Sequence, residues 1–176
     1  EGVQDVLNEF PQFASTVEAF ARSDFQEAGR LALALRDDAR RSNDRTGEAV
    51  ATAWIGASLA QQSRYQEAME HLLAAIGNFE ELGRADLAAR PYNYVAIVYE
   101  ELGDFDAAFA SYAHALAGAR AAGQRELEGR ILGNIGEAYV NLARFEEARE
   151  PLEQASEILG ELGEWALQGW VIWAKG

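Results

Sequence analysis

The chain has 176 residues, of which 49% are hydrophobic, so it holds enough apolar material for one domain with a buried core. Its 15 Lys and Arg residues stand against 29 Asp and Glu residues, and the net charge of -14 argues against nucleic acid or an anionic membrane as partner. The lack of cysteine excludes disulfides and thiolate metal sites and fits a reducing cytoplasmic compartment. The sequence also has no apolar run long enough to span a membrane. The acidic surface either attracts a basic partner or only keeps the chain in solution.

An internal repeat of 40 residues is the main signal in the sequence. An aromatic residue opens each copy of a similar segment, and an alanine follows it three residues later: Phe25 and Ala28, Tyr65 and Ala68, Phe105 and Ala108, Phe145 and Ala148. A residue that tolerates the left-handed conformation at a helix end recurs with the same spacing: Asn43, Gly83, Gly123, Gly163. A second break precedes each aromatic residue, at Ser23, Ser63, Gly103 and Ala143. Each unit is therefore predicted to be two helices joined by short turns.

The apolar spacing within these units is that of amphipathic helices. In chain order, we expect helices over 3–22, 24–41, 45–62, 64–81, 85–102, 104–121, 125–142, 144–161 and 164–175. Asp24 and Asp104 stand where they can cap the helices that follow them. Pro91 and Pro151 fall inside two of these ranges, which predicts a kink at each, or a helix that starts close to Pro91.

Small residues recur at one position in the first helix of a unit, at Gly56, Ala96 and Gly136. They allow two helices to approach closely, while a large residue on the facing helix fills the remaining volume.

The pattern resembles the tetratricopeptide repeat. The fourth unit is the best match, through Leu132, Ile135, Gly136, Tyr139, Phe145, Ala148, Leu152 and Ala155. The resemblance implies an all-α, right-handed α-solenoid of about four helix-turn-helix repeats (3–43, 44–83, 84–123, 124–163) and a terminal helix over 164–176. It also implies one array over 1–176, here expected to be a fragment of a larger protein.

The 40-residue period is longer than usual for this family. It is similar to the arrays of kinesin light chains, Pins-like scaffolds and bacterial regulatory proteins. The resemblance implies a non-enzymatic, regulatory module that binds a protein or peptide in the cytoplasm, without a cofactor. The family's carboxylate clamp for C-terminal peptides uses lysines that this chain lacks at the matching positions, which argues against chaperone tails.

The first helix of each unit is expected to line the concave wall of the solenoid. Its positions outside the core pattern are predicted to contact the partner: Trp54, Arg90, Asn93, Tyr94, Glu101, Arg130, Asn134, Glu137 and Asn141. Val50, Ala53 and Ala57 belong to the same class of position.

Three pairs among these residues carry alternative interpretations. Arg90 and Arg130 either hold a carboxylate or phosphate of a partner, or pair with neighbours such as Glu126 and Glu128. Asn93 and Asn134 either bind a peptide backbone or form part of a solvated face. Trp54 and Tyr94 form an aromatic platform or pack between repeats.

The remaining candidate features favour structure over chemistry. His71 and His114 lie in different repeats without a second histidine nearby, so no metal site and no catalytic residues are predicted. The last helix carries Trp165, Trp170 and Trp173, whose burial against a second copy would produce a homodimer. Three hypotheses follow: a partner-binding groove, self-association through these tryptophans, or a sensor for a small ligand that controls an attached output domain.

Overall fold

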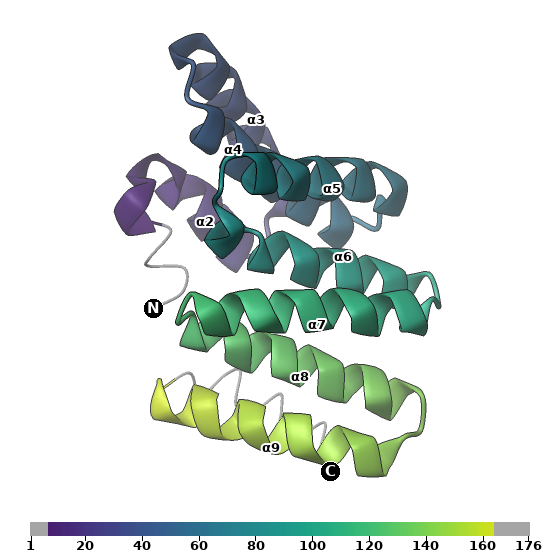
Figure 1. Cartoon of the computed structure of the whole chain (residues 1–176). Coiled ribbons are helices and arrows are strands. Elements are labelled where there is room, and N and C mark those ends of the chain that lie inside the picture. The colour runs from purple at the N-terminus through teal and green to yellow at the C-terminus, as the bar shows by residue number, and fades with distance from the viewer. Residues whose placement is uncertain (1–6, 164–176) are drawn as a thin grey trace.

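The computed structural model describes residues 7–163, and within these residues the fold is all-α (Figure 1). The helices are α2 (Ala14–Ala21), α3 (Phe25–Ser42), α4 (Arg45–Gln61), α5 (Tyr65–Glu81), α6 (Ala89–Glu101), α7 (Phe105–Ala121), α8 (Arg125–Asn141) and α9 (Phe145–Glu161). Two short 3-10 helices, η1 (Pro11–Phe13) and η2 (Ala85–Leu87), precede α2 and α6.

The helix ends lie where the 40-residue spacing predicts them. The four residues predicted to tolerate a left-handed helix end all have positive φ: Asn43 at 57°, Gly83 at 68°, Gly123 at 67° and Gly163 at 74°. The four residues at the break before each repeated aromatic residue share this conformation, with φ values of 60° at Ser23, 57° at Ser63, 79° at Gly103 and 56° at Ala143. A left-handed residue reverses the chain within one or two positions and so brings the next helix back beside the last.

Aspartate side chains cap three of the helices. Oδ1 of Asp24 accepts a hydrogen bond from the backbone N–H of Glu27 at 3.1 Å, and Asp104 accepts one from Ala107 at the same distance. Asp44 does the same for Gly47 at the start of α4. Each cap satisfies a backbone donor that the first turn of a helix leaves free.

The prediction of one continuous helix over 3–22 is wrong. The chain leaves the helical conformation at Phe10 (φ -125°, ψ 65°), forms η1, and only then begins α2. Pro11 explains the break, because a proline disfavours the helical conformation of the residue before it.

Pro91 sets the start of α6, which begins at Ala89 rather than at residue 85. Pro91 has no N–H to bond with the carbonyl four residues earlier, so it fits a helix only in the first turn. Ala89 is the earliest start that keeps Pro91 there, and the alternative of a helix start close to Pro91 is confirmed. By contrast, α9 runs through Pro151 without interruption.

Successive helices pack as antiparallel pairs, and the pairs stack in chain order (Figure 1). The core consists of three clusters of buried side chains, which follow one another along the stack. Glycines set the spacing inside a pair: a Cβ atom on Gly56 would lie 2.7 Å from Cγ of Leu72. The first helices of neighbouring repeats also touch, α4 with α6 and α6 with α8, and together they form the inner wall.

Candidate partner-binding site

A pocket lies in the inner wall, where α4 and α6 meet. It encloses about 520 Å³ of empty space, including the part that is open to solvent. Six of its lining residues are positions that the sequence assigns to the concave wall: Val50, Ala53, Trp54, Ala57, Arg90 and Tyr94. Phe79, Leu87 and Pro91 complete the apolar lining, while Asp86 and Gln124 add polar groups. The site is thus mostly apolar with a few polar groups, as ligand sites usually are.

Arg90 is the cationic group of this pocket. Its side chain is half-buried, and it has no hydrogen bond or ion pair with any residue that the structure describes. Burial lowers the pKa of Arg90 and the positive charge of Arg130 acts in the same direction, whereas Tyr94 and the carboxylate of Glu126 oppose them. A guanidinium that is partly removed from water and makes no direct ion pair with a described residue gains from an anion that a ligand brings.

Arg130 occupies the equivalent position on α8 but is already neutralised. Its Nε donates to Oε1 of Glu126, four residues earlier, at 2.9 Å. Burial alone would raise the pKa of Glu126, yet the charges of Arg130 and Arg90 hold that pKa below its usual value. Asp86 stands four residues before Arg90 in the same way.

The late start of α6 explains why Arg90 differs from Arg130. Asp86 lies in η2, outside the α-helix, so it is not one helical turn from Arg90. Instead it accepts hydrogen bonds from Nε and Nη2 of Arg84 at 2.9 Å and 2.8 Å. Arg84 also donates to both carboxylate oxygens of Glu9, at 2.6 Å and 2.8 Å. Of the two arginines, the one in the pocket is therefore Arg90, which has no ion pair among residues 7–163.

An aromatic cluster forms the wall beside Arg90. The ring of Phe20, from α2, meets Trp54 edge to face with 5.4 Å between centroids and meets Tyr94 at 6.0 Å. Trp54 is buried and Tyr94 is half-buried. Phe20 is a residue of this wall that the sequence did not predict. Its place in an irregular first repeat gave no spacing signal that would have assigned it to the inner wall.

Other predicted groove residues form hydrogen bonds with side chains of the neighbouring repeat. Asn134 Nδ2 donates to Oδ1 of the buried Asn93 at 3.0 Å, which ties α8 to α6. Asn141 Nδ2 donates to Oε1 of Glu100 at 2.9 Å. Tyr65 donates its O–H to Oε2 of Glu101 at 3.2 Å. In this structure these side chains link helices of neighbouring repeats.

Glu137 lies beyond these pairs on α8, and its environment is acidic. Burial raises the pKa of Glu137, and the carboxylates of Glu100 and Glu101 raise it further. The pKa of Glu100 is also raised by burial, although hydrogen bonds from Asn141 and Tyr112 oppose this. The part of the inner wall around Glu100, Glu101 and Glu137 is therefore acidic.

The remaining candidates carry no assembled chemistry in the described part of the chain. Within residues 7–163 no three His, Asp or Glu side chains gather as metal ligands, and no helix is long and apolar enough to cross a membrane. His114 stacks on the ring of Tyr92, with 5.1 Å between centroids. The predicted self-association residues Trp165, Trp170 and Trp173 lie outside the described residues.

Stacked antiparallel helix pairs with an inner wall of first helices define an α-solenoid. The family model of the tetratricopeptide repeat matches residues 49–121 and 87–161, which together span more than half of the chain. The chain belongs to the tetratricopeptide repeat family, whose members are non-catalytic scaffolds that generally mediate protein–protein interaction.

Among solved structures, the chain is similar to BtubC (BKLC) from P. vanneervenii. The TM-score is 0.68 at 19% sequence identity, over 90% of this chain and 69% of that chain. At this identity the match shows the fold alone. The search among curated proteins found no significant match.

Proposed function

We propose that this chain is a regulatory binding module that holds a peptide segment of a partner protein in its inner wall. The supporting observation is the pocket between α4 and α6, where apolar side chains surround the guanidinium of Arg90, which makes no ion pair with a described residue. A segment that fits this pocket presents an apolar side chain to Trp54 and Tyr94 and an anionic group to Arg90. The lack of cysteine agrees with a cytoplasmic setting.

Two substitutions test this function. Arg90→Gln removes the cation and Ala53→Leu fills the pocket, whereas Arg45→Gln removes an exposed arginine on the same helix as Ala53 and serves as control. A partner is first captured from lysate, then purified, and its affinity is measured by calorimetry. We expect both pocket variants to weaken binding about tenfold or more, because charge-assisted hydrogen bonds and apolar anchors dominate such sites. Equal affinity of the partner for the unchanged chain and for all three variants would show that the partner binds outside this pocket.

A small anionic ligand is the second candidate, and the composition of the pocket favours it. Its lining is mostly apolar, with Arg90 as the cationic group, as in many small-molecule sites. Thermal stabilisation by a panel of aromatic and aliphatic carboxylates, lost in Arg90→Gln, would support the sensor over the peptide groove. Stabilisation by peptides alone would support the groove.

A further inference from the structure

The pocket between α4 and α6 is bordered by charges of both signs that do not pair with each other. Arg90 and Asp86 both line it. Asp86 pairs with Arg84, however, and Arg90 makes no ion pair with a residue that the structure describes. Opposite charges that stay apart at one pocket can each bind a complementary charge of a ligand. The ligand that fits this arrangement therefore carries a cation as well as an anion.

Arg90 and Tyr94, one turn apart on α6, can bind the anion. Neither the guanidinium of Arg90 nor the hydroxyl of Tyr94 has a hydrogen bond with a described residue, and both side chains are half-buried. Both groups can donate to a carboxylate, which accepts from several donors. Because Arg130 is already bonded to Glu126, the anion meets one guanidinium at this pocket, which matches the single charge of a carboxylate better than the double charge of a phosphate.

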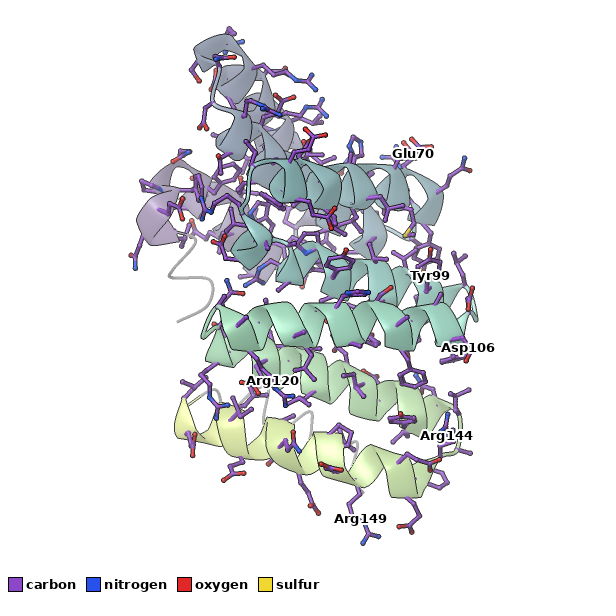
Figure 2. All side chains as sticks on the ribbon, in the orientation of Figure 1. Glu70, Tyr99, Asp106, Arg120, Arg144 and Arg149 are labelled. Carbon is purple, nitrogen blue, oxygen red and sulfur yellow. The ribbon has the colours of Figure 1, made fainter. Side chains whose placement is uncertain are left out.

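Arginines further along the stack illustrate the contrast with Arg90. Figure 2 places Arg120 on α7 and Arg144 at the start of α9, outside the pocket. Arg120 pairs with Glu128 at 2.8 Å. Arg144 pairs with Glu147 at 3.0 Å. Arg90 has no such partner within residues 7–163, so a ligand can supply it without first breaking an ion pair.

Asp86 can bind the cation, because its charge is not fully neutralised. Arg84 carries one positive charge but contacts two carboxylates, Glu9 at 2.6 Å and Asp86 at 2.8 Å. At neutral pH these three side chains together keep one negative charge. The Asp86 side chain is 43% exposed, and a carboxylate has lone pairs for further donors. Gln124 donates its Nε2 to the backbone carbonyl of Asp86 at 3.2 Å, so its Oε1 is a second acceptor at this border.

The rest of the lining is apolar and includes Trp54, Phe79 and Leu87. A ligand for this pocket therefore combines an anion, a cation and an apolar group within a few bonds of one another. In a peptide, an internal residue has no charge on its main chain, and a terminal residue has one. A free α-amino acid carries both charges on the same carbon atom.

We propose that the pocket binds a free α-amino acid with an apolar side chain, such as leucine. The carboxylate of the amino acid bonds to Arg90 and Tyr94. Its ammonium group bonds to Asp86 and Gln124, and its side chain packs against Trp54. The inference rests on the small-ligand form of the proposed function, because it assigns a ligand to the same pocket.

Three ligands with one apolar skeleton test the proposal on the unchanged chain, by titration calorimetry at neutral pH. Leucine carries both charges, isocaproate lacks the ammonium group, and isoamylamine lacks the carboxylate. We expect leucine to bind at least about tenfold more tightly than either of the others, because each of them leaves one charged group of the pocket without its partner.

Substitutions separate the two charges of the ligand. Arg90→Gln should weaken leucine and isocaproate about tenfold or more, without weakening isoamylamine. Asp86→Asn should make leucine and isocaproate bind equally. Arg84→Gln should strengthen leucine about threefold, because it frees the Asp86 carboxylate, whereas the loss of a nearby positive charge would weaken a ligand that is only an anion. Asp38→Asn, at an exposed carboxylate paired with Arg41, is the control and should leave all three affinities unchanged.

The outcomes that would overturn the amino-acid assignment are distinct from failure of the proposed function. Equal affinities for leucine and isocaproate would overturn it and leave an anion-binding pocket intact. Equal affinities for leucine and isoamylamine, or leucine binding that survives Arg90→Gln, would also overturn it. So would the absence of binding by all three ligands, while the peptide groove is decided separately by the captured partner and Ala53→Leu.

Discussion

Gly136 on α8 faces Leu152 on α9 so closely that a Cβ atom on Gly136 would lie 2.4 Å from the side-chain carbons of Leu152. Gly56 and Leu72 have the same relationship within the pair formed by α4 and α5. The leucines are fully buried, so the volume that each glycine leaves open is already filled by the facing helix. The distance between the two helices of these repeats thus depends on a missing side chain.

Gly136→Ala should therefore destabilise the fold, although alanine favours a helix. Overpacking of a filled core costs about 1–3 kcal/mol, which exceeds the gain in helix propensity. Gly77→Ala is the control, because a Cβ atom at Gly77 on α5 would meet nothing within 4 Å. That variant should stabilise the chain by about 0.5–1 kcal/mol. Urea unfolding followed by circular dichroism compares both, and opposite signs are required.

The turns between helices offer a second comparison. Ala143 adopts φ 56° between α8 and α9, a left-handed conformation that costs a residue with a Cβ atom about 1–2 kcal/mol. Ala143→Gly should raise the free energy of unfolding by about 1 kcal/mol, since glycine adopts this conformation readily. Gly103→Ala, at φ 79°, should lower it by a similar amount. Thermal unfolding that moves in the same direction for both would contradict the assignment of strain to these turns.

Glu137 predicts a pH dependence. Its pKa is raised by burial and by the carboxylates of Glu100 and Glu101, so the folded state binds the proton more readily than the unfolded state. The stability that this group contributes is complete below the unfolded pKa and is lost as the pH rises through the folded pKa. Glu137→Gln should thus stabilise the chain at about pH 7 and have little effect near about pH 4.

Glu147 is the control of opposite sign. The hydrogen bond from Arg144 lowers the pKa of Glu147, so its contribution is present at neutral pH and is lost as the pH falls through the folded pKa. Glu147→Gln should destabilise the chain at neutral pH and lose its effect in acid. Differences of the same sign for the two variants across the pH series would refute the assignment.

Arg84 joins two distant parts of the chain. Its contacts with Glu9 and Asp86 attach the segment before α2 to the turn before α6. We expect Arg84→Gln to lower the free energy of unfolding by about 1 kcal/mol, the upper end for ion pairs near the surface. It should also speed proteolysis between residues 7 and 13. The exposed pair of Arg41 with Asp38 provides the comparison, and Arg41→Gln should be nearly neutral.

The periodicity of the sequence predicts most of the fold. Ser63 and Ala143 show its strength, because neither residue type favours a left-handed conformation, and only the 40-residue spacing marks them as turns. The first helix was predicted wrongly because an irregular terminal repeat provides no spacing to correct a local pattern. There the effect of Pro11 on Phe10 prevailed over the apolar periodicity.

The site could be predicted only in part. Spacing places Val50, Trp54, Arg90 and Tyr94 on one wall, since positions 40 residues apart lie in register. It cannot show which polar groups meet, because this depends on the rotation between neighbouring repeats. The bond between Asn93 and Asn134, which are 41 residues apart, is one example. The contrast between Arg90 and Arg130 is another, because both follow an acidic residue by four positions.

Pro91 breaks the equivalence of units that otherwise share one plan. By delaying α6 to Ala89, it leaves Asp86 outside the helix, where Asp86 pairs with Arg84, and Arg90 has no ion pair with a described residue. Pro91 thereby makes one repeat of an otherwise regular array distinct in the charge that it presents on the inner wall. Proline at the corresponding position of α8, Ile131, should likewise favour a later helix start and weaken the pair of Arg130 with Glu126, although it also removes a fully buried isoleucine from the core. The location of an available cation along such a stack can in this way be changed without altering its period.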